Sequence, residues 1–531
     1  MGAGSALRSV RVLWNVVTNY ARLGLNAAIA FVLTPYMVHH MGDRDYGLWV
    51  TVFSLTGYFG LFDQGIRPSL VRYVSRDHAL GDHPGLSRTI SSAIVLYTAV
   101  GVATMAAAWV VAVNAPLWIR MDPALHRIAP TLVLLVGGTL ALGFPLGVFG
   151  AVLSGLQRYD LANGIGMAVG VLRMVAFITV LRANGGLVAL AWTSLAVNFL
   201  GHLWSWFAVR RLLPHVAIGP AWVKREYFRR IAAYGSWALV GALATNIAFQ
   251  TDALVITAFI GTAFAAPFAI AGGLVDNARS LVTAAAYVLS PTASEMDALG
   301  QGEKLRHMLV AGSKYSVLVS WPVLLGMIVY GPNLLHTWVG ARYESASLLL
   351  TILAVPTMVA LPQATASSVL FGISKHRGIV LLSILSAVLN LGLSVWWAGH
   401  PAAMAFLFGE TVRPALVGVA MGTAVPLLVI SGFVTAWYAC RVLEEPFLAY
   451  LWAGMLRPGL VCVAFAFPAV AVQWRWHPVG WLPMLGACAG SWLVFAVIAW
   501  FAGISSGDRE RWGRMASGLL VRRPAGGGSR V

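Results

Sequence analysis

Long apolar segments separated by short polar connections make up most of this sequence. Fourteen of them reach the length of about 20 mostly apolar residues that a helix needs to cross a bilayer. They lack the alternation of apolar and polar residues that marks the strands of a membrane barrel. The sequence therefore predicts an all-α polytopic membrane protein with about 14 transmembrane helices. The predicted spans are residues 12–38, 46–66, 89–113, 127–153, 161–182, 187–209, 232–259, 264–290, 308–330, 345–371, 376–398, 413–440, 453–473 and 480–502.

The composition excludes a soluble protein of this length. Hydrophobic residues make up 59% of the 531 residues and charged residues only 10%, against roughly 45–50% and about 25% in soluble proteins. So few charges cannot cover the surface of a soluble fold. The net charge of +17 lies mainly in loops and in the C-terminal tail. The expected partner of these basic residues is anionic membrane lipid and not nucleic acid.

The distribution of Lys and Arg predicts the orientation in the membrane. An even number of spans puts both termini on one side, and 25 of the 36 basic residues fall on that side. Seven fall on the opposite side and four lie inside spans. Because cytoplasmic loops carry the excess of basic residues, both termini are predicted to be cytoplasmic. The basic tail fits either a helix on the inner membrane face or a solvated linker.

A shift of 219 residues aligns features of the two halves of the chain. It places Gly42 on Gly261, and it places the sequence Ala-Leu-Gly at 79–81 on the same sequence at 298–300. The alternative is chance matching of common residues. A repeat whose copies are separated by six helices is parallel, about an axis along the membrane normal. It predicts a six-helix bundle at 1–225, a second at 226–445, two additional helices at 446–503 and a basic tail at 504–531.

Proteins built from two such halves are transporters in which the substrate lies between the halves and access alternates. Arg22 is the first candidate for the substrate site, because an arginine at the centre of a membrane helix costs about 2.5–3.5 kcal/mol unless it faces a partner or a wet cavity. Asn19 and Asn26 lie on the same helical face as Arg22. These three residues are predicted to line a cavity. The alternative is that Arg22 pairs with a buried carboxylate or carbonyl group.

A second polar group lies in the predicted eighth helix and comprises Asp276, Asn277 and Arg279. Asp276 and Arg279 are three residues apart and are able to pair with each other. In the other interpretation, Arg279 faces Arg22 across the repeat and Asn277 joins the cavity. Two guanidinium groups there would suit a pyrophosphate, because the planar fork of arginine matches phosphate oxygens.

Three carboxylates are candidates for ion coupling: Asp252, Asp276 and Asp63. A carboxylate inside a membrane is able to carry a coupling H⁺ or Na⁺. For Asp63 the alternative is a local pair with Arg67 at a helix end. No P-loop, nucleophile elbow or zinc motif is present, so we expect no cofactor, no metal site and no enzymatic activity.

Several local motifs resemble those of a known family. The chain is similar to the bacterial polysaccharide-biosynthesis membrane proteins, the O-antigen-type oligosaccharide flippases of the multidrug/oligosaccharidyl-lipid/polysaccharide exporter superfamily. The motifs are Thr-Pro-Tyr at 34–36, Gly-Asp-Arg-Asp-Tyr-Gly-Leu-Trp at 42–49, Phe-Asp-Gln-Gly-Ile at 62–66, Leu-Val-Arg-Tyr-Val at 70–74 and Thr-Asp-Ala-Leu-Val-Ile at 251–256.

This resemblance implies a bacterial inner-membrane protein that moves an undecaprenyl-pyrophosphate-linked oligosaccharide to the periplasmic leaflet. It also implies that Arg22 and Arg279 line the cavity. A polysaccharide polymerase or export machinery is then a possible partner. The rival within the same fold is a multidrug exporter, which the two arginines disfavour for cationic drugs. The rival of another class is a membrane polymerase or a glycosyltransferase with Asp43 and Asp45 at a metal, although their loop is only a turn.

Overall fold

The computed structural model describes residues 2–231, 250–409, 412–503 and 509. Within these ranges the chain is helical and contains no strand. The first part consists of α1 (Gly2–Phe59), α2 (Leu61–Ala79), α3 (His83–Trp118), η1 (Pro123–Leu125), α4 (Ile128–Gly155), α5 (Tyr159–Arg182), α6 (Leu187–Leu212) and η2 (Pro220–Trp222). A helix at 250–259 and η3 (Thr262–Phe264) follow.

The second part continues with α8 (Ala265–Tyr287), α9 (Leu289–Ala298), α10 (Gly302–Val329), α11 (Gly331–Val339), η4 (Ala341–Ala346), α12 (Ser347–Ala360), α13 (Gln363–Gly372) and α14 (Arg377–Gly399). The last elements are α15 (Ala402–Phe408), α16 (Pro414–Pro426), a π-helical segment (Leu427–Val434), α17 (Thr435–Leu443), α18 (Phe447–Tyr450), a second π-helical segment (Leu451–Leu456), α19 (Arg457–Trp476), α20 (Trp481–Ile498) and a final π-helical turn (Ala499–Gly503).

Eleven helices in the described ranges are long and apolar enough to cross a membrane. They account for twelve of the fourteen predicted spans, because one candidate, Val17–Phe59, contains most of the first predicted span and most of the second. The predicted span 232–259 lies mostly outside the described residues. The predicted span 264–290 corresponds to α8, whose Asp276, Asn277 and Arg279 lower its mean hydropathy. The predicted all-α polytopic class is confirmed.

Gly42 allows the first two predicted spans to join in one element. Its φ of 74° and ψ of 172° break the helical geometry inside α1, and a left-handed φ of this kind suits glycine best. The chain therefore reverses at Gly42 without a loop. The sequence correctly predicted a tight glycine turn at this position.

The turns at 80–82 and 299–301 have matching backbone geometry. Gly81 has a φ of 67° and Gly300 a φ of 66°. Leu80 and Leu299 each donate their N–H to the carbonyl four residues before, and the following glycines each donate to the carbonyl three residues before. The helices that follow begin at His83 and Gly302, again 219 residues apart. This agreement in local structure supports the predicted repeat.

The described chain divides into two compact units. Unit 1 comprises residues 1–277 and 380–426, and unit 2 comprises residues 278–379 and 427–531. These units are defined by packing, whereas the predicted six-helix bundles are defined by the repeat in the sequence. The bounds of the bundles therefore remain a prediction. The core of unit 1 includes Leu70, Ile90, Tyr97 and Val148, all at most 1% exposed. In the described residues of unit 2, one core lies around Leu309 and Tyr450 and another around Phe465.

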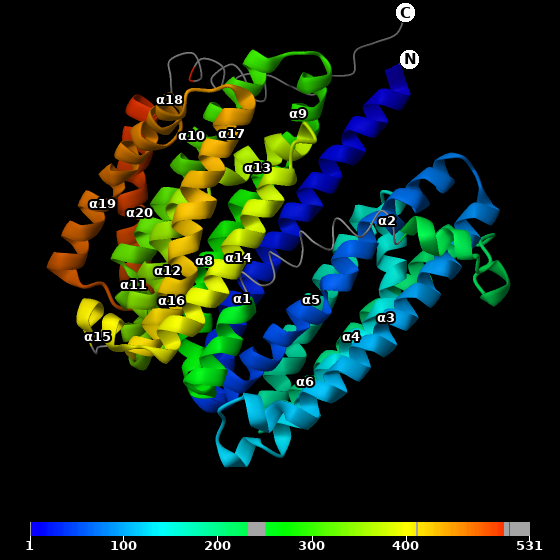
Figure 1. Cartoon of the computed structure of the whole chain (residues 1–531), viewed down its shortest axis with the longest axis horizontal. Helices are drawn as coiled ribbons and strands as arrows, with labels where there is room; N and C mark the ends of the chain where they lie inside the picture. The colour runs from blue at the N-terminus through cyan, green and yellow to red at the C-terminus, as the bar shows by residue number, and fades with distance from the viewer. Residues whose placement is uncertain (1, 232–249, 410–411, 504–508, 510–531) are drawn as a thin grey trace, which may run out of the picture. The chain divides into compact units, whose positions relative to one another are not determined.

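Small residues bring the helices of unit 1 together. A Cβ placed on Gly101 of α3 would lie 2.4 Å from the carbonyl oxygen of Ala141, and one on Gly137 of α4 would lie 2.4 Å from Cβ of Ala108. Only glycine permits such close approach of two backbones. As a result α3 packs along α4, and α6 covers α4 as well (Figure 1).

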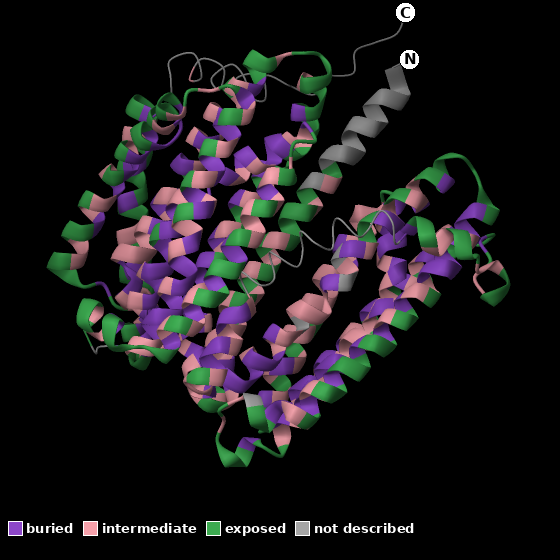
Figure 2. Cartoon of the chain, in the orientation of Figure 1, coloured by how far each residue is buried: buried purple, intermediate pink, exposed green. Residues whose placement is uncertain are grey.

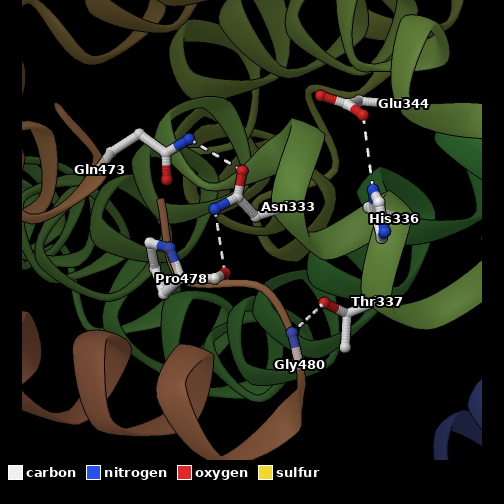
Figure 3. Close-up of polar contacts among 7 residues, drawn as sticks. All are labelled: Asn333, His336, Thr337, Glu344, Gln473, Pro478 and Gly480. Atoms are coloured by element: carbon white, nitrogen blue, oxygen red, sulfur yellow. Dashed lines mark hydrogen bonds and ion pairs between the residues drawn. The ribbon is translucent and has the colours of Figure 1, made fainter. Parts of the chain in front are cut away.

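Polar contacts attach the last helical hairpin of unit 2 to α11. Asn333, which is 5% exposed, donates from Nδ2 to the carbonyl oxygen of Pro478 over 2.9 Å and accepts from Nε2 of Gln473 over 2.9 Å. The N–H of Gly480 donates to the hydroxyl of Thr337 over 2.9 Å (Figure 3). These contacts hold the turn between α19 and α20 in place.

Candidate functional site

The first half of α1 carries an accessible polar face. None of the described residues between 14 and 36 is buried (Figure 2). Arg22, Asn19 and Asn26 are all exposed, and their spacing in the helix puts them on one face. Within the described part of the chain, Arg22 forms no ion pair with a carboxylate. The face is therefore able to contact a polar or anionic molecule.

Helix α5 supports this polar face from within unit 1. Asn163, which is 2% exposed, donates from Nδ2 to Oγ1 of Thr18 and to Oδ1 of Asn19, each over 3.2 Å. A Cβ placed on Gly166 would lie 3.4 Å from Cδ of Arg22. The arginine side chain thus lies directly over a glycine, which leaves room for its aliphatic part against α5.

Gly170 extends the same contact by one turn. A Cβ on this residue would lie 3.2 Å from Cδ1 of Ile29 and 3.6 Å from Oδ1 of Asn26. Gly166 and Gly170 have the four-residue spacing that permits close helix contact. Together with Asn163 they form an α5 platform that positions Asn19, Arg22 and Asn26.

The residues predicted in the eighth helix lie in α8. Asp276 is exposed, and Asn277 and Arg279 are partly exposed. The carbonyl of Arg279 accepts a hydrogen bond from Oγ1 of Thr283 over 2.7 Å. Arg22 and Arg279 belong to different compact units, each described by itself. Their predicted convergence on one substrate therefore remains a prediction.

Asp252 lies deep in unit 1 and is 5% exposed. Its Oδ2 accepts a hydrogen bond of 2.6 Å from Oγ1 of Thr423 in α16. That hydroxyl in turn accepts from Nδ2 of Asn390 in α14 over 3.0 Å. Oδ1 of Asp252 has no hydrogen-bond partner among the described residues. Burying a carboxylate in this way is costly unless a proton or a cation neutralises it.

Asp63 lies near the start of α2 and has two partners. Oδ2 accepts from Nε of Arg67 over 2.9 Å, and Oδ1 accepts from the hydroxyl of Tyr97 over 2.8 Å. The local pair with Arg67 that the sequence suggested is present. The buried tyrosine in α3 adds a contact that fixes the carboxylate.

Three residues of these sites were missed by the sequence analysis. Asn163 supports the α1 face, and Asn390 and Thr423 surround Asp252. All three are uncharged polar residues in apolar helices and are buried. Their signal in the sequence is weak, because Asn and Thr occur throughout the membrane segments.

Comparison with known proteins identifies the family. Residues 12–297 match the model of a family described as polysaccharide biosynthesis protein. No curated protein matches the chain.

Solved structures share the fold at low sequence identity. The lipid II flippase MurJ in an inward closed conformation is 11% identical with a TM-score of 0.69, over 92% of this chain and 98% of MurJ. An inward-facing MATE-family multidrug resistance transporter of the MOP superfamily is 17% identical with a TM-score of 0.61, over 80% and 94%.

A MOP-superfamily transporter from Pyrococcus furiosus, whose binding pocket is described as having reverse polarity, is 14% identical with a TM-score of 0.57, over 81% and 96%. These likenesses show a shared fold of polytopic helical transporters. Together with the family match over more than half of the sequence, they lead to one conclusion: the chain belongs to the polysaccharide biosynthesis protein family.

Proposed function

We propose that this protein is a flippase that moves an undecaprenyl-pyrophosphate-linked oligosaccharide from the cytoplasmic to the periplasmic leaflet by alternating access. The observation that carries the proposal is the exposed Arg22 on the polar face of a membrane-spanning helix. A guanidinium at this depth is expensive in lipid and favourable beside a phosphate. Asn19 and Asn26, on the same face, offer hydrogen bonds to sugar hydroxyls.

Arg279 and Asn277 supply the second half of the proposed cavity. Both lie in α8 and are accessible. A diphosphate carries enough oxygens to engage two guanidinium groups at once, and the planar fork of arginine matches such oxygens better than the point charge of lysine. The polyprenyl chain would stay in the lipid, so only the headgroup needs the cavity.

Ion coupling through Asp252 is the second element of the proposal. The carboxylate of Asp252 and the hydroxyl of Thr423 bring side-chain oxygens from two helices together, and the amide nitrogen of Asn390 donates to that hydroxyl from a third helix. Hard cations such as Na⁺ bind oxygen ligands of this kind, and a proton would neutralise the carboxylate equally well. Asp276 and Asp63 are weaker candidates, since Asp276 is exposed and Asp63 is paired with Arg67.

The test uses a deletion strain complemented with variants of the full chain. Arg22→Ala and Arg279→Ala are expected to abolish surface polysaccharide at unchanged protein level, while Arg22→Lys and Arg279→Lys restore part of it. Lipid-linked intermediates are expected to accumulate on the inner leaflet. Arg182→Ala is the matched control, because this exposed arginine ends α5 away from the α5 platform. Full function of both alanine variants would remove the anionic cavity from the proposal.

The same deletion strain distinguishes the proposed flippase from a multidrug exporter and from a membrane enzyme. A multidrug exporter of this fold would make the deletion strain sensitive to cationic drugs and leave surface polysaccharide intact. A polymerase or glycosyltransferase would lose activity with Asp43→Ala.

The proposed location is the bacterial inner membrane with both termini in the cytoplasm, which reporter fusions at the two ends would check. Proximity labelling would detect a polymerase or export partner.

A further inference from the structure

An open pocket with two arginines lies at the end of unit 1 where the chain turns at Gly42. Its volume is about 530 Å³, and Arg120, Phe259, Pro401, Ala405 and Arg413 are among the residues that line it. Several turns meet at this end, as shown by the 2.9 Å ion pair between Arg44 and Asp122. The distribution of basic residues predicts that this end lies on the periplasmic side.

Arg120 is fixed at the pocket by the end of the 250–259 helix and by the turn that follows it. Its N–H donates to the carbonyl of Thr257 over 2.9 Å, and its own carbonyl accepts from the N–H of Thr262 over 3.1 Å. Its Nη1 donates to the carbonyl of Phe259 over 2.7 Å. The guanidinium is exposed and keeps further N–H groups for a ligand.

Arg413 approaches from the start of α16. Its guanidinium carbon lies 4.2 Å from the centre of the Phe264 ring, which holds the side chain by a cation–π contact. Within the described part of the chain, neither Arg120 nor Arg413 pairs with a carboxylate. The nearby Asp122 is engaged by Arg44 and by the N–H of Ala124 over 2.9 Å. The pocket thus offers two positive charges that no described acidic group neutralises.

The rest of the pocket is apolar and borders the short helix α15, which packs beside α16 (Figure 1). Phe406 and Leu407 of α15 are 90% and 63% exposed. Large apolar side chains exposed at the end of a membrane domain favour insertion at the level of the lipid headgroups. A soluble anion would gain nothing from this apolar wall, whereas an anionic lipid would use both the wall and the arginines.

We propose that this pocket binds the phosphate group of an anionic lipid in the periplasmic leaflet, with the lipid chain lying along α15. The two guanidinium groups hold the phosphate oxygens. The site is separate from the polar face of α1 and does not depend on the proposed cargo. Two sources have the required chemistry, an anionic phospholipid and a polyprenyl phosphate.

The test measures lipid retained by the purified full-length protein in native mass spectrometry. Protein in neutral detergent is offered phosphatidylglycerol, undecaprenyl phosphate or phosphatidylcholine in separate arms. We expect at least tenfold more of one anionic lipid than of phosphatidylcholine, and the preferred arm identifies the source. The double variant Arg120→Gln/Arg413→Gln is expected to lose at least tenfold of that retention. Arg127→Gln is the matched control, because this exposed arginine lies in the same connection but does not line the pocket.

Equal retention by the double variant and the wild type would overturn the proposal. So would full displacement of the lipid by inorganic phosphate, because the apolar wall would then contribute nothing. Since Arg120 also bonds to Phe259, Arg413→Gln alone serves where the double variant unfolds. The guanidinium of Arg413 bonds to no described carbonyl, so this variant is expected to fold and to retain at least threefold less lipid.

Discussion

The hydroxyl of Thr423 donates a 2.6 Å hydrogen bond to Oδ2 of Asp252, across 171 residues of sequence. Asp252→Asn keeps the shape of this side chain and removes its charge. If the carboxylate carries the coupling ion, we expect transport to fall at least tenfold in this variant and any stabilisation of the protein by Na⁺ or by acid to disappear. Thermal unfolding with and without Na⁺, across a pH series, measures the second effect.

Thr423→Val tests the same contact from the other side. It removes the hydroxyl that donates to Asp252 and leaves the buried carboxylate without this hydrogen bond. A hydrogen bond to a charged group contributes about 1.5–3 kcal/mol. Thr423→Ser keeps the donor and is the matched control. Wild-type transport in Asp252→Asn would exclude this carboxylate from coupling.

Gly47 of α1 lies directly against the turn at η3. A Cβ at this position would lie 1.8 Å from the carbonyl oxygen of Thr262, so the two backbones must separate in Gly47→Ala. We expect a loss of about 1–3 kcal/mol in the free energy of unfolding. In Gly24→Ala the new Cβ meets nothing within 4 Å, so the same change should be neutral or stabilising by up to about 1 kcal/mol. Thermal unfolding of the two variants measures this difference, and equal unfolding midpoints would disprove the close contact between Gly47 and Thr262.

Features with a strong local signal were predictable from the sequence. The helical spacing of Asn19, Arg22 and Asn26 predicted that they share one helical face, and the structure leaves all three exposed, while their role in lining a cavity stays a prediction. The tight turn at Gly42 and the matching turns at 81 and 300 were also predictable, because a left-handed backbone requires residues such as glycine.

Features that depend on tertiary packing were not predictable. Nothing near Arg22 in the sequence indicates that Gly166 lies beneath it, 144 residues later. The surroundings of Asp252 depend on α14 and α16, which lie far along the chain. Uncharged polar residues such as Asn163 carry no periodic signal in an apolar helix, so their roles appear only once the helices are packed.

Asp77 gives the protein a pH dependence outside the membrane spans. It is buried near the end of α2 and accepts from Oγ1 of Thr89 over 2.8 Å. Burial raises the pKa of its carboxyl above the ordinary value of 3.8, although the hydrogen bond from Thr89 opposes the shift. Because the folded state holds this proton more tightly than the unfolded state, the carboxyl contributes most stability below pH 3.8, where it is protonated in both states. This stability is lost as the pH rises through the folded-state pKa.

We therefore expect the unfolding temperature of the wild type to fall relative to Asp77→Asn as the pH rises above about 4. The asparagine keeps an acceptor for Thr89 but cannot ionise. Thr89→Val removes the opposing hydrogen bond, so the same loss should extend to higher pH. A pH-independent difference between the wild type and Asp77→Asn would rule out this titration.

Asn333 and His336 lie on the same short helix, α11, and provide a matched pair of substitutions (Figure 3). Asn333→Ala would leave the carbonyl of Pro478 and the amide of Gln473 without their bonds. Each unsatisfied group costs about 1–3 kcal/mol. The contact between His336 and Glu344 spans 3.5 Å at the surface, and such exposed pairs contribute about 0–1 kcal/mol.

Asn333→Ala should therefore lower the free energy of unfolding by about 2–6 kcal/mol, while His336→Ala leaves it within about 1 kcal/mol. Hydrogen exchange locates the effect: amide protons in the turn at 477–480 should exchange faster only in the first variant, because Asn333 binds that turn directly. Equal protection of the turn in both variants would mean that the packing of α19 against α20, and not the bonds to α11, holds the last hairpin of unit 2.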